Sequence, residues 1–152
     1  MFSAGISGLQ RLSQLRFLRI RSVRLSGLKQ LNRMRRLERL SLCWCEIEDA
    51  KEIGNISALV CLDLQGNKIA DISFLKNMVG LIKLSLDRNQ IADISVLQHL
   101  VNLDELNIGK NKITDISSLR NLVCLKQLNL WDNKINNFSV LQNLVNLSYL
   151  NL

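Results

Sequence analysis

The sequence predicts an α/β repeat solenoid with a concave parallel β-sheet and convex 3₁₀ turns. Three observations predict it. Leucines recur every 22 residues, with no insertion or deletion, at Leu59, Leu81, Leu103, Leu125 and Leu147. Each leucine opens a stretch in which apolar residues alternate with polar ones, and a stretch with apolar residues at every third position follows. A fixed period indicates stacked units that contact only their neighbours.

The repeat register runs through the whole chain and predicts a single array over residues 1–152. It continues backwards through Leu37 and Leu15, and Ile6, Leu9 and Leu12 have the spacing of the tail of an earlier copy. Full coils are predicted at 15–36, 37–58, 59–80, 81–102, 103–124 and 125–146, with partial coils at 1–14 and 147–152. Both ends lack a polar capping element, so we expect a fragment of a longer array or end-to-end self-association.

Each coil is expected to begin with a short strand and to return through a 3₁₀ turn. In the coil 81–102, inward Leu81, Leu84 and Leu86 alternate with outward Lys83, Ser85 and Asp87, which is the period of a half-buried strand. Apolar residues then recur at every third position, at Ile91, Ile94, Leu97 and Leu100. This spacing suits a 3₁₀ turn, in which side chains at i and i+3 eclipse.

Aspartates at the start of the return path are interpreted as caps rather than catalytic acids. Asp71, Asp93 and Asp115 each precede a serine by two residues, so each carboxylate can accept a backbone N–H at the start of its turn.

Inward asparagines at the end of each strand predict a structural ladder. A buried amide at this position must bond backbone groups that the turn leaves unpaired. The predicted ladder consists of Asn67, Asn89, Asn111 and Asn133. Cys45 and Val23 occupy the equivalent positions nearer the start, so we expect the first coils to be less well fixed.

Charge is concentrated in the first coils. Up to Cys45 the sequence has ten basic residues against the single acid Glu38, whereas the whole chain carries a net charge of +7. Arg16, Arg19, Arg21 and Arg39 are expected on the concave side, and Arg33, Arg35 and Arg36 on the return path. One alternative function is therefore binding of nucleic acid or another anionic surface by these coils.

The compartment is inferred from the cysteines and from the N-terminal sequence. Cys43, Cys45, Cys61 and Cys124 are not placed for disulfides, which favours an intracellular protein, cytoplasmic or nuclear. The Arg-rich residues 1 to about 30 offer an organellar presequence as an alternative, although their apolar residues keep the repeat phase. The sequence contains no run of eighteen apolar residues, so it predicts no membrane span.

The strand motifs LVCLDLQGN, LIKLSLDRN, LDELNIGKN and LKQLNLWDN, each followed by KIADI, QIADI, KITDI or KINNF, resemble the 22-residue class of leucine-rich repeat proteins. This class includes the nuclear regulatory subunit of type-one protein phosphatase and the internalins. The resemblance implies a curved leucine-rich repeat array that acts as a protein-binding scaffold or a regulatory subunit, with a partner of unknown identity. A phosphatase partner stays open as an alternative but lacks support, since no concave column alternates acidic and aromatic residues.

A hypothetical partner-binding set follows from the rare aromatics near the concave face, which are Phe17, Trp44, Trp131 and Tyr149. Aromatic and arginine residues dominate interface energetics once they are buried. The predicted set is Trp44, Lys83, Asp87, Arg88, Lys110 and Trp131. The alternative interpretation is that each tryptophan only covers a neighbouring coil.

No catalytic residue, metal site or cofactor is predicted. His99 is the only histidine and is expected on the convex return path, away from any thiol. Cys43 and Cys45 form a CxC pair whose side chains should point to opposite faces, whereas zinc needs about four converging ligands. Gly66 and Gly109 are interpreted as isolated turn residues rather than as part of a phosphate loop.

Overall fold

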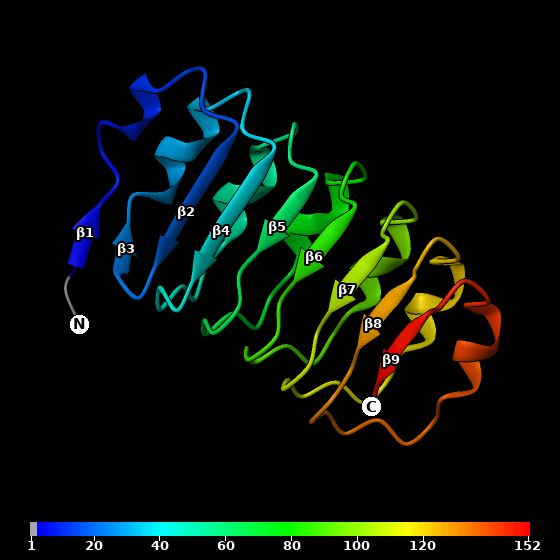
Figure 1. Cartoon of the computed structure of the whole chain (residues 1–152). Helices are drawn as coiled ribbons and strands as arrows, with labels where there is room; N and C mark the ends of the chain where they lie inside the picture. The colour runs from blue at the N-terminus through cyan, green and yellow to red at the C-terminus, as the bar shows by residue number, and fades with distance from the viewer. Residues whose placement is uncertain (1–2) are drawn as a thin grey trace.

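The computed structural model describes residues 3–152 and shows a solenoid built around one parallel sheet of seven strands (Figure 1). The strands pair in chain order, so every coil contributes one strand beside the previous one. They are β2 (Phe17–Arg21), β4 (Arg39–Cys43), β5 (Cys61–Asp63), β6 (Lys83–Ser85), β7 (Glu105–Asn107), β8 (Gln127–Asn129) and β9 (Tyr149–Asn151). The predicted fold class is confirmed.

The pairing register equals the sequence period. Lys83 on β6 lies opposite Glu105 on β7, which lies opposite Gln127 on β8, and each step is 22 residues. Residues 22 positions apart therefore form columns that run along the solenoid. This fixed register lets a column be read directly from the sequence.

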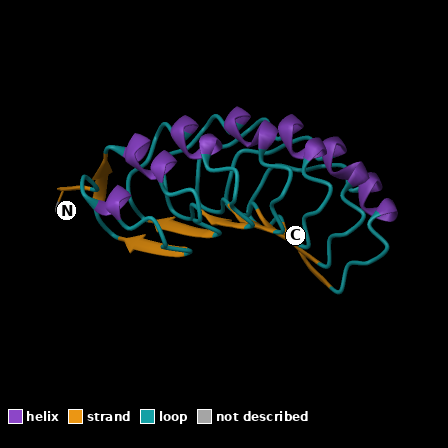
Figure 2. Cartoon of the chain, turned by 90° about the horizontal axis from the view of Figure 1, so that it is seen from above, coloured by secondary structure: helices purple, strands orange, loops and turns teal. Residues whose placement is uncertain are grey.

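Short 3₁₀ helices form the outer side of the arc, opposite the sheet (Figure 2). In each, an N–H bonds the carbonyl three residues earlier, as from Leu100 N to Leu97 O at 2.9 Å. They are η1 (Leu9–Arg11), η2 (Leu28–Arg33), η3 (Lys51–Asn55), η4 (Ser73–Asn77), η5 (Ser95–His99), η6 (Ser117–Asn121) and η7 (Ser139–Asn143).

The predicted aspartate caps are confirmed. The backbone N–H of Ser95 donates to Asp93 Oδ1, and that of Ser117 to Asp115 Oδ1, both at 2.8 Å. Asp71 accepts from the N–H of Ser73 at the same distance. Each carboxylate thus satisfies a donor that the first turn leaves without an intrahelical partner.

The core is a stack of leucine and isoleucine layers, one per coil, between the sheet and the 3₁₀ helices. In the coil 81–102, Leu86 and Ile91 are completely buried, as is Leu97 on η5. Polar residues on the strands point to the other face. The sheet therefore has one dry face, against the core, and one face left open along the inner side of the arc (Figure 2).

The asparagines at the strand ends form a continuous hydrogen-bonded ladder. Asn111 Nδ2 donates to Leu86 O in the previous coil and to Ile108 O in its own, both at 3.1 Å, while its Oδ1 accepts the N–H of Ile91 at 3.0 Å. Asn89 repeats these bonds one coil earlier with Leu64, Leu86 and Ile69. The remaining rungs, made with the same pattern, are Asn67 and Asn133.

The Cys45 thiol occupies the next position of the ladder and bonds matching backbone acceptors. Its Sγ donates to Ile20 O, 25 residues earlier, at 3.7 Å and to Cys43 O at 3.3 Å. The Asn67 amide bonds carbonyls at the same two separations. A thiol is a weaker donor than an amide, so the ladder weakens at Cys45 and the side chain of Val23 ends it.

The first coils differ from the rest in one feature that the sequence pattern did not predict. β1 (Ser3–Gly5) and β3 (Arg24–Ser26) pair in parallel as a separate two-stranded sheet, again with a separation of about one coil. Ile6, which follows β1, is buried in the core. The first two residues of the predicted partial coil 1–14 lie outside the described residues.

Candidate functional site

The open face of the sheet carries a shallow groove of about 380 Å³ across the strands β5 to β9. Its walls are the outward strand side chains, including Asp63, Lys83, Glu105, Gln127 and Tyr149. Because the sheet is parallel and in register, these side chains stand in columns. Neighbouring strands, and so successive side chains of one column, are about 4.8 Å apart. The groove is thus a polar surface with an exposed aromatic ring, Tyr149, at one end.

Lys83 and Glu105, which line this groove, form an ion pair across two neighbouring strands. Lys83 Nζ donates to Glu105 Oε1, and this hydrogen bond raises the pKa of Lys83. Both side chains are partly exposed, so the pair contributes little to stability. Both charges remain available to a partner that approaches along the strand face.

Asp87 lies below this surface rather than on it, which limits its role in the predicted contact set. Only 3% of the residue is exposed. Its carboxylate accepts hydrogen bonds from Gln65 Nε2 at 2.8 Å and from Ser85 Oγ at 2.9 Å. Arg88 Nε stands 3.9 Å away. Asp87 therefore orients the groups around it.

The residues just after the strands adopt a left-handed backbone conformation. Trp44 and Arg88 have φ of 57° and Lys110 has φ of 50°, values that non-glycine residues rarely adopt. Their N–H groups extend the sheet ladder: Arg88 N donates to Gly109 O at 2.9 Å and Lys110 N to Trp131 O at 2.6 Å. These bonds hold the unfavourable conformation and direct the side chains along the rim of the groove.

Arg88, Lys110 and Trp131 converge into one cluster at that rim. The Arg88 guanidinium carbon lies 5.2 Å from the centre of the Trp131 ring, and Lys110 Nζ lies 5.8 Å from it. Both distances fall within the range of cation–π attraction. The cluster presents an aromatic surface flanked by two positive charges, which suits carboxylate or carbonyl groups beside an apolar side chain.

Each tryptophan rests on a glycine one coil away in its own column. A Cβ added at Gly109 would overlap the Trp131 ring, and one added at Gly66 would overlap the Trp44 ring. The interpretation of these glycines as isolated turn residues is therefore incomplete. The 22-residue separation between each tryptophan and its glycine was the sequence signal for this packing.

Trp44 stays apart from the cluster around Trp131. It lies in an earlier coil, packs on Gly66, and is 38% exposed. Trp131 has two cationic neighbours, whereas no cation–π contact to Trp44 is found within residues 3–152. The predicted set thus divides into a cluster and three separate residues. The cluster is Arg88, Lys110 and Trp131, and the separate residues are Lys83 in the groove, the buried Asp87 and Trp44. Glu105, which pairs with Lys83, was not predicted.

The cysteines on and near this face are free thiols with suppressed reactivity. Cys43 Sγ donates to Asp63 Oδ2 at 3.0 Å, and Ser41 Oγ donates to the same oxygen at 3.1 Å. Burial and the hydrogen bond to Asp63 raise the pKa of Cys43 to about 11. Burial also raises the pKa of Cys61. A protonated thiol is a poor nucleophile and a poor metal ligand.

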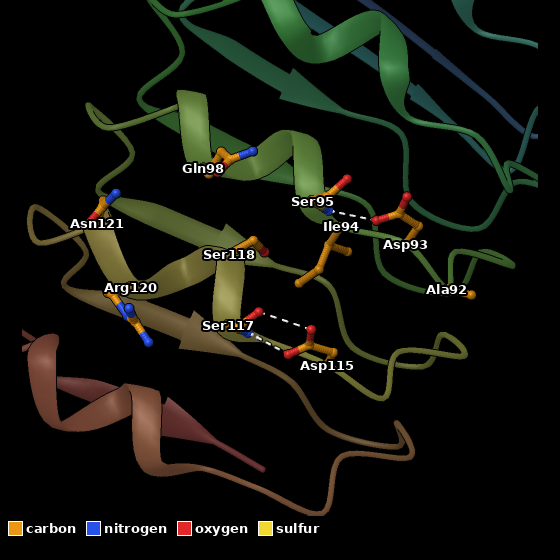
Figure 3. A pocket seen from close by; sticks show the side chains of 10 residues that line it. All are labelled: Ala92, Asp93, Ile94, Ser95, Gln98, Asp115, Ser117, Ser118, Arg120 and Asn121. Atoms are coloured by element: carbon orange, nitrogen blue, oxygen red, sulfur yellow. Dashed lines mark hydrogen bonds between the residues drawn. The ribbon is translucent and has the colours of Figure 1, made fainter.

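A larger cavity of about 460 Å³ lies on the opposite, outer side, between η5 and η6 (Figure 3). Its acidic residues, Asp93 and Asp115, point to the serines that they cap rather than towards one another. The hydrogen bonds from Ser95 and Ser117 lower the pKa of the two carboxyls. We therefore interpret this cavity as a gap between consecutive turns, with its carboxylates committed to structure.

Neither a metal site nor a membrane-spanning helix is found in the described part of the chain. Among residues 3–152, no three His, Cys, Asp or Glu side chains are arranged to hold a metal ion. His99 is exposed on η5, on the outer side. None of the helices within this range has the length and apolar character needed to cross a bilayer.

Comparison with known proteins agrees with this architecture. A family model described as "Leucine Rich repeats (2 copies)" matches residues 57–99 and 79–121. An internalin, InlF, from Listeria monocytogenes has 32% identity and a TM-score of 0.88 over 97% of this chain. Internalin C2 from the same organism has 29% identity and a TM-score of 0.87 over the full chain. No curated protein sequence matches significantly.

A leucine-rich repeat protein of Leptospira interrogans is similar over the full chain, with 26% identity and a TM-score of 0.88. The chain spans 50% of the length of InlF, 77% of internalin C2 and 40% of the Leptospira protein. The similarity therefore covers a repeat region and not the whole of these neighbours.

Proposed function

Because the chain is a leucine-rich repeat protein, we propose that it is a non-catalytic scaffold that binds a partner protein on the open face of its sheet. Such a scaffold uses its repeated backbone to hold variable outward side chains in fixed columns. The scaffold role also suits a regulatory subunit, whose activity is the binding itself.

The observation that carries this proposal is the cluster of Arg88, Lys110 and Trp131 beside the groove. Trp and Arg side chains supply most of the binding energy in protein interfaces when a partner excludes water from them. Here backbone hydrogen bonds hold Arg88 and Lys110 in position, and the Trp131 ring packs between Gly109 and the two cations. Less side-chain entropy is then lost on association.

The neighbouring groove supplies the polar contacts that such an anchor needs. Lys83 and Glu105 offer one charge of each sign, and Gln127 and Asn129 offer amides along the next strand. Tyr149, half exposed, adds a second ring on the far strand. An aromatic anchor with a polar surround is the usual composition of a specific protein interface.

Affinity capture from cell lysate tests the proposal. The wild-type chain and an Arg88→Ala/Lys110→Ala/Trp131→Ala variant are compared after washing at low and moderate salt. A protein retained by the wild type at moderate salt and lost by the variant is the expected result. Lys76→Ala/Arg120→Ala, which removes two exposed charges on the outer helices η4 and η6, serves as the matched control.

Equal retention by the wild type and the cluster variant would contradict the proposed face. Loss of the partner in both variants would point to a general effect of charge rather than to this cluster. Thermal unfolding of each variant establishes that the solenoid is intact, since Trp131 also packs on a neighbouring coil.

A further inference from the structure

Three arginines at the start of the sheet form an exposed patch on the same open face. Arg19 and Arg21 alternate along β2 with Leu18 and Ile20, which pack towards the core. Arg39 opens β4 next to them, paired in register with Phe17. All three arginines are exposed. We call Arg19, Arg21 and Arg39 the arginine patch.

The arginine patch carries charge that the protein itself does not neutralise. Nearby, Arg16 pairs with Glu38 and Arg24 pairs with Glu46, both at 3.6 Å. Among the described residues, no carboxylate lies within 4.0 Å of the three patch guanidinium groups. Three uncompensated guanidinium groups within two adjacent strands attract an anion at short range.

The outward side chains of β4 next to the patch are small. Ser41 and Cys43, which lie opposite Arg19 and Arg21 in the register, are small and buried. Both donate to Asp63 on the following strand, so the arginines are the free donors next to it. Because Asp63 holds its carboxylate beside β4, an anionic group approaches Arg19 and Arg21 from the side of β2, which is the edge strand of the seven-stranded sheet.

We propose that the arginine patch binds a short acidic segment of the partner protein in an extended conformation. This inference rests on the proposed function and specifies the chemistry of the partner. Arg19 and Arg21 are two residues apart on a strand, which separates them by about 6.6 Å. Alternate side chains of an extended peptide have the same spacing, so two carboxylates can each meet one guanidinium fork.

The charge beyond the patch favours a short acidic segment over a nucleic acid. In the column of Arg19, the position after Ser41 carries Asp63 on β5. A polyanion that continued along this column would meet the Asp63 carboxylate and be repelled. Phe17, 54% exposed, and Trp44, 38% exposed, lie beside the patch at opposite ends of β2 and β4, whereas proteins that bind single strands stack several successive bases on aromatic rings.

Fluorescence anisotropy with a labelled peptide of alternating glutamate and serine tests the proposal. The full chain is titrated at low and moderate salt. An Arg19→Gln/Arg21→Gln variant should weaken binding about tenfold or more, because two charge-assisted contacts are lost. Arg33→Gln/Arg35→Gln removes the same charge from exposed positions at the end of η2 and just after it, and should change affinity less than about twofold.

Two further measurements make the test specific. An Arg19→Lys/Arg21→Lys variant keeps the charge but loses the fork geometry, so it should bind with intermediate affinity. A peptide with glutamine in place of glutamate should not bind. Equal weakening by both glutamine variants, or tighter binding of a labelled oligothymidylate than of the acidic peptide, would overturn the proposal.

The lysate capture separates failure of the patch from failure of the proposed function. If the captured protein depends on Arg88, Lys110 and Trp131 but is fully retained by the Arg19→Gln/Arg21→Gln variant, the patch proposal fails and the scaffold function stands. If the acidic peptide binds the patch and no captured protein depends on Arg88, Lys110 and Trp131, the patch proposal stands and the assignment of this cluster as the anchor of the scaffold fails.

Discussion

The indole of Trp131 lies against the backbone of Gly109, the residue at the same position one coil earlier. No side chain larger than hydrogen fits beneath the ring. Gly109→Ala should therefore displace the indole and destabilise the protein by about 1–2 kcal/mol. The displacement should also weaken the contacts of Trp131 with Arg88 and Lys110, and urea unfolding monitored by circular dichroism measures the loss.

A double-mutant cycle isolates this effect. In a Trp131→Ala background, Gly109→Ala should cost close to nothing, because the overlapping ring has gone. Gly80→Ala is the matched control, since its nearest atom is Leu59 O at 3.9 Å. A cost for Gly109→Ala that persists without the tryptophan would show that the glycine serves the backbone instead.

Asn111 should be much more important to stability than Asn102, although the two amides lie in neighbouring loops of the array. Asn111 is buried and bonds two carbonyls and one N–H at about 3 Å. Asn111→Ala strands these groups inside the core and should cost about 3 kcal/mol.

Asn102 provides the comparison for this asparagine. It is exposed and makes one bond, to Val79 O at 3.0 Å. Asn102→Ala should therefore cost under about 1 kcal/mol. Similar urea midpoints for the two variants would refute the structural role assigned to the ladder.

The repeat period explains why so much of the fold could be predicted from the sequence. Once 22 residues equal one coil, Leu84, Ile91 and Leu97 are assigned to the core, and Asp93 to a cap, by position alone. The strand pairing follows without further information, because a solenoid pairs each strand with the next.

The candidate site was less predictable because its details depend on side chains from neighbouring coils. Asp87 occupies an outward position in the pattern, yet Gln65 and Ser85 enclose it. The thiol of Cys45 takes over bonds that an asparagine makes elsewhere. The contact between Trp131 and Gly109 could be predicted from their 22-residue separation. Such a prediction requires comparing residues of the same column, because neither residue indicates the contact by itself.

The four thiols should react with iodoacetamide in order of exposure. Cys124 is exposed, Cys61 is partly buried, and Cys43 and Cys45 are buried. With the pKa of Cys43 raised from 9.0 to about 11, its thiolate fraction at pH 8 is about a hundredth of that of an ordinary thiol. Timed labelling followed by peptide mass spectrometry should therefore show Cys124 modified first and Cys43 and Cys45 last.

Urea-unfolded protein is the control for this experiment. All four cysteines should then label at similar rates, because the packing that separates them is gone. Native Cys43 labelling as fast as Cys124 would contradict both its burial and its hydrogen bond to Asp63.

The caps Asp93 and Asp115 should make the solenoid sensitive to acid. The N–H groups of Ser95 and Ser117 hold the pKa of these carboxyls below the ordinary value of 3.8. The unfolded chain then takes up protons more readily than the folded one as the pH falls. Their stabilising contribution is complete well above pH 3.8 and is lost as the pH falls through 3.8 to the lower folded pKa.

An Asp93→Asn/Asp115→Asn variant should reduce this acid sensitivity. An amide oxygen can still accept the capping bond, as Asn137 Oδ1 does from the N–H of Ser139 at 2.9 Å. The urea midpoint at pH 7 should therefore change little, while the difference between pH 7 and pH 3 becomes smaller than in the wild type. The same difference in both proteins would mean that other carboxyls, and not these caps, govern the acid response.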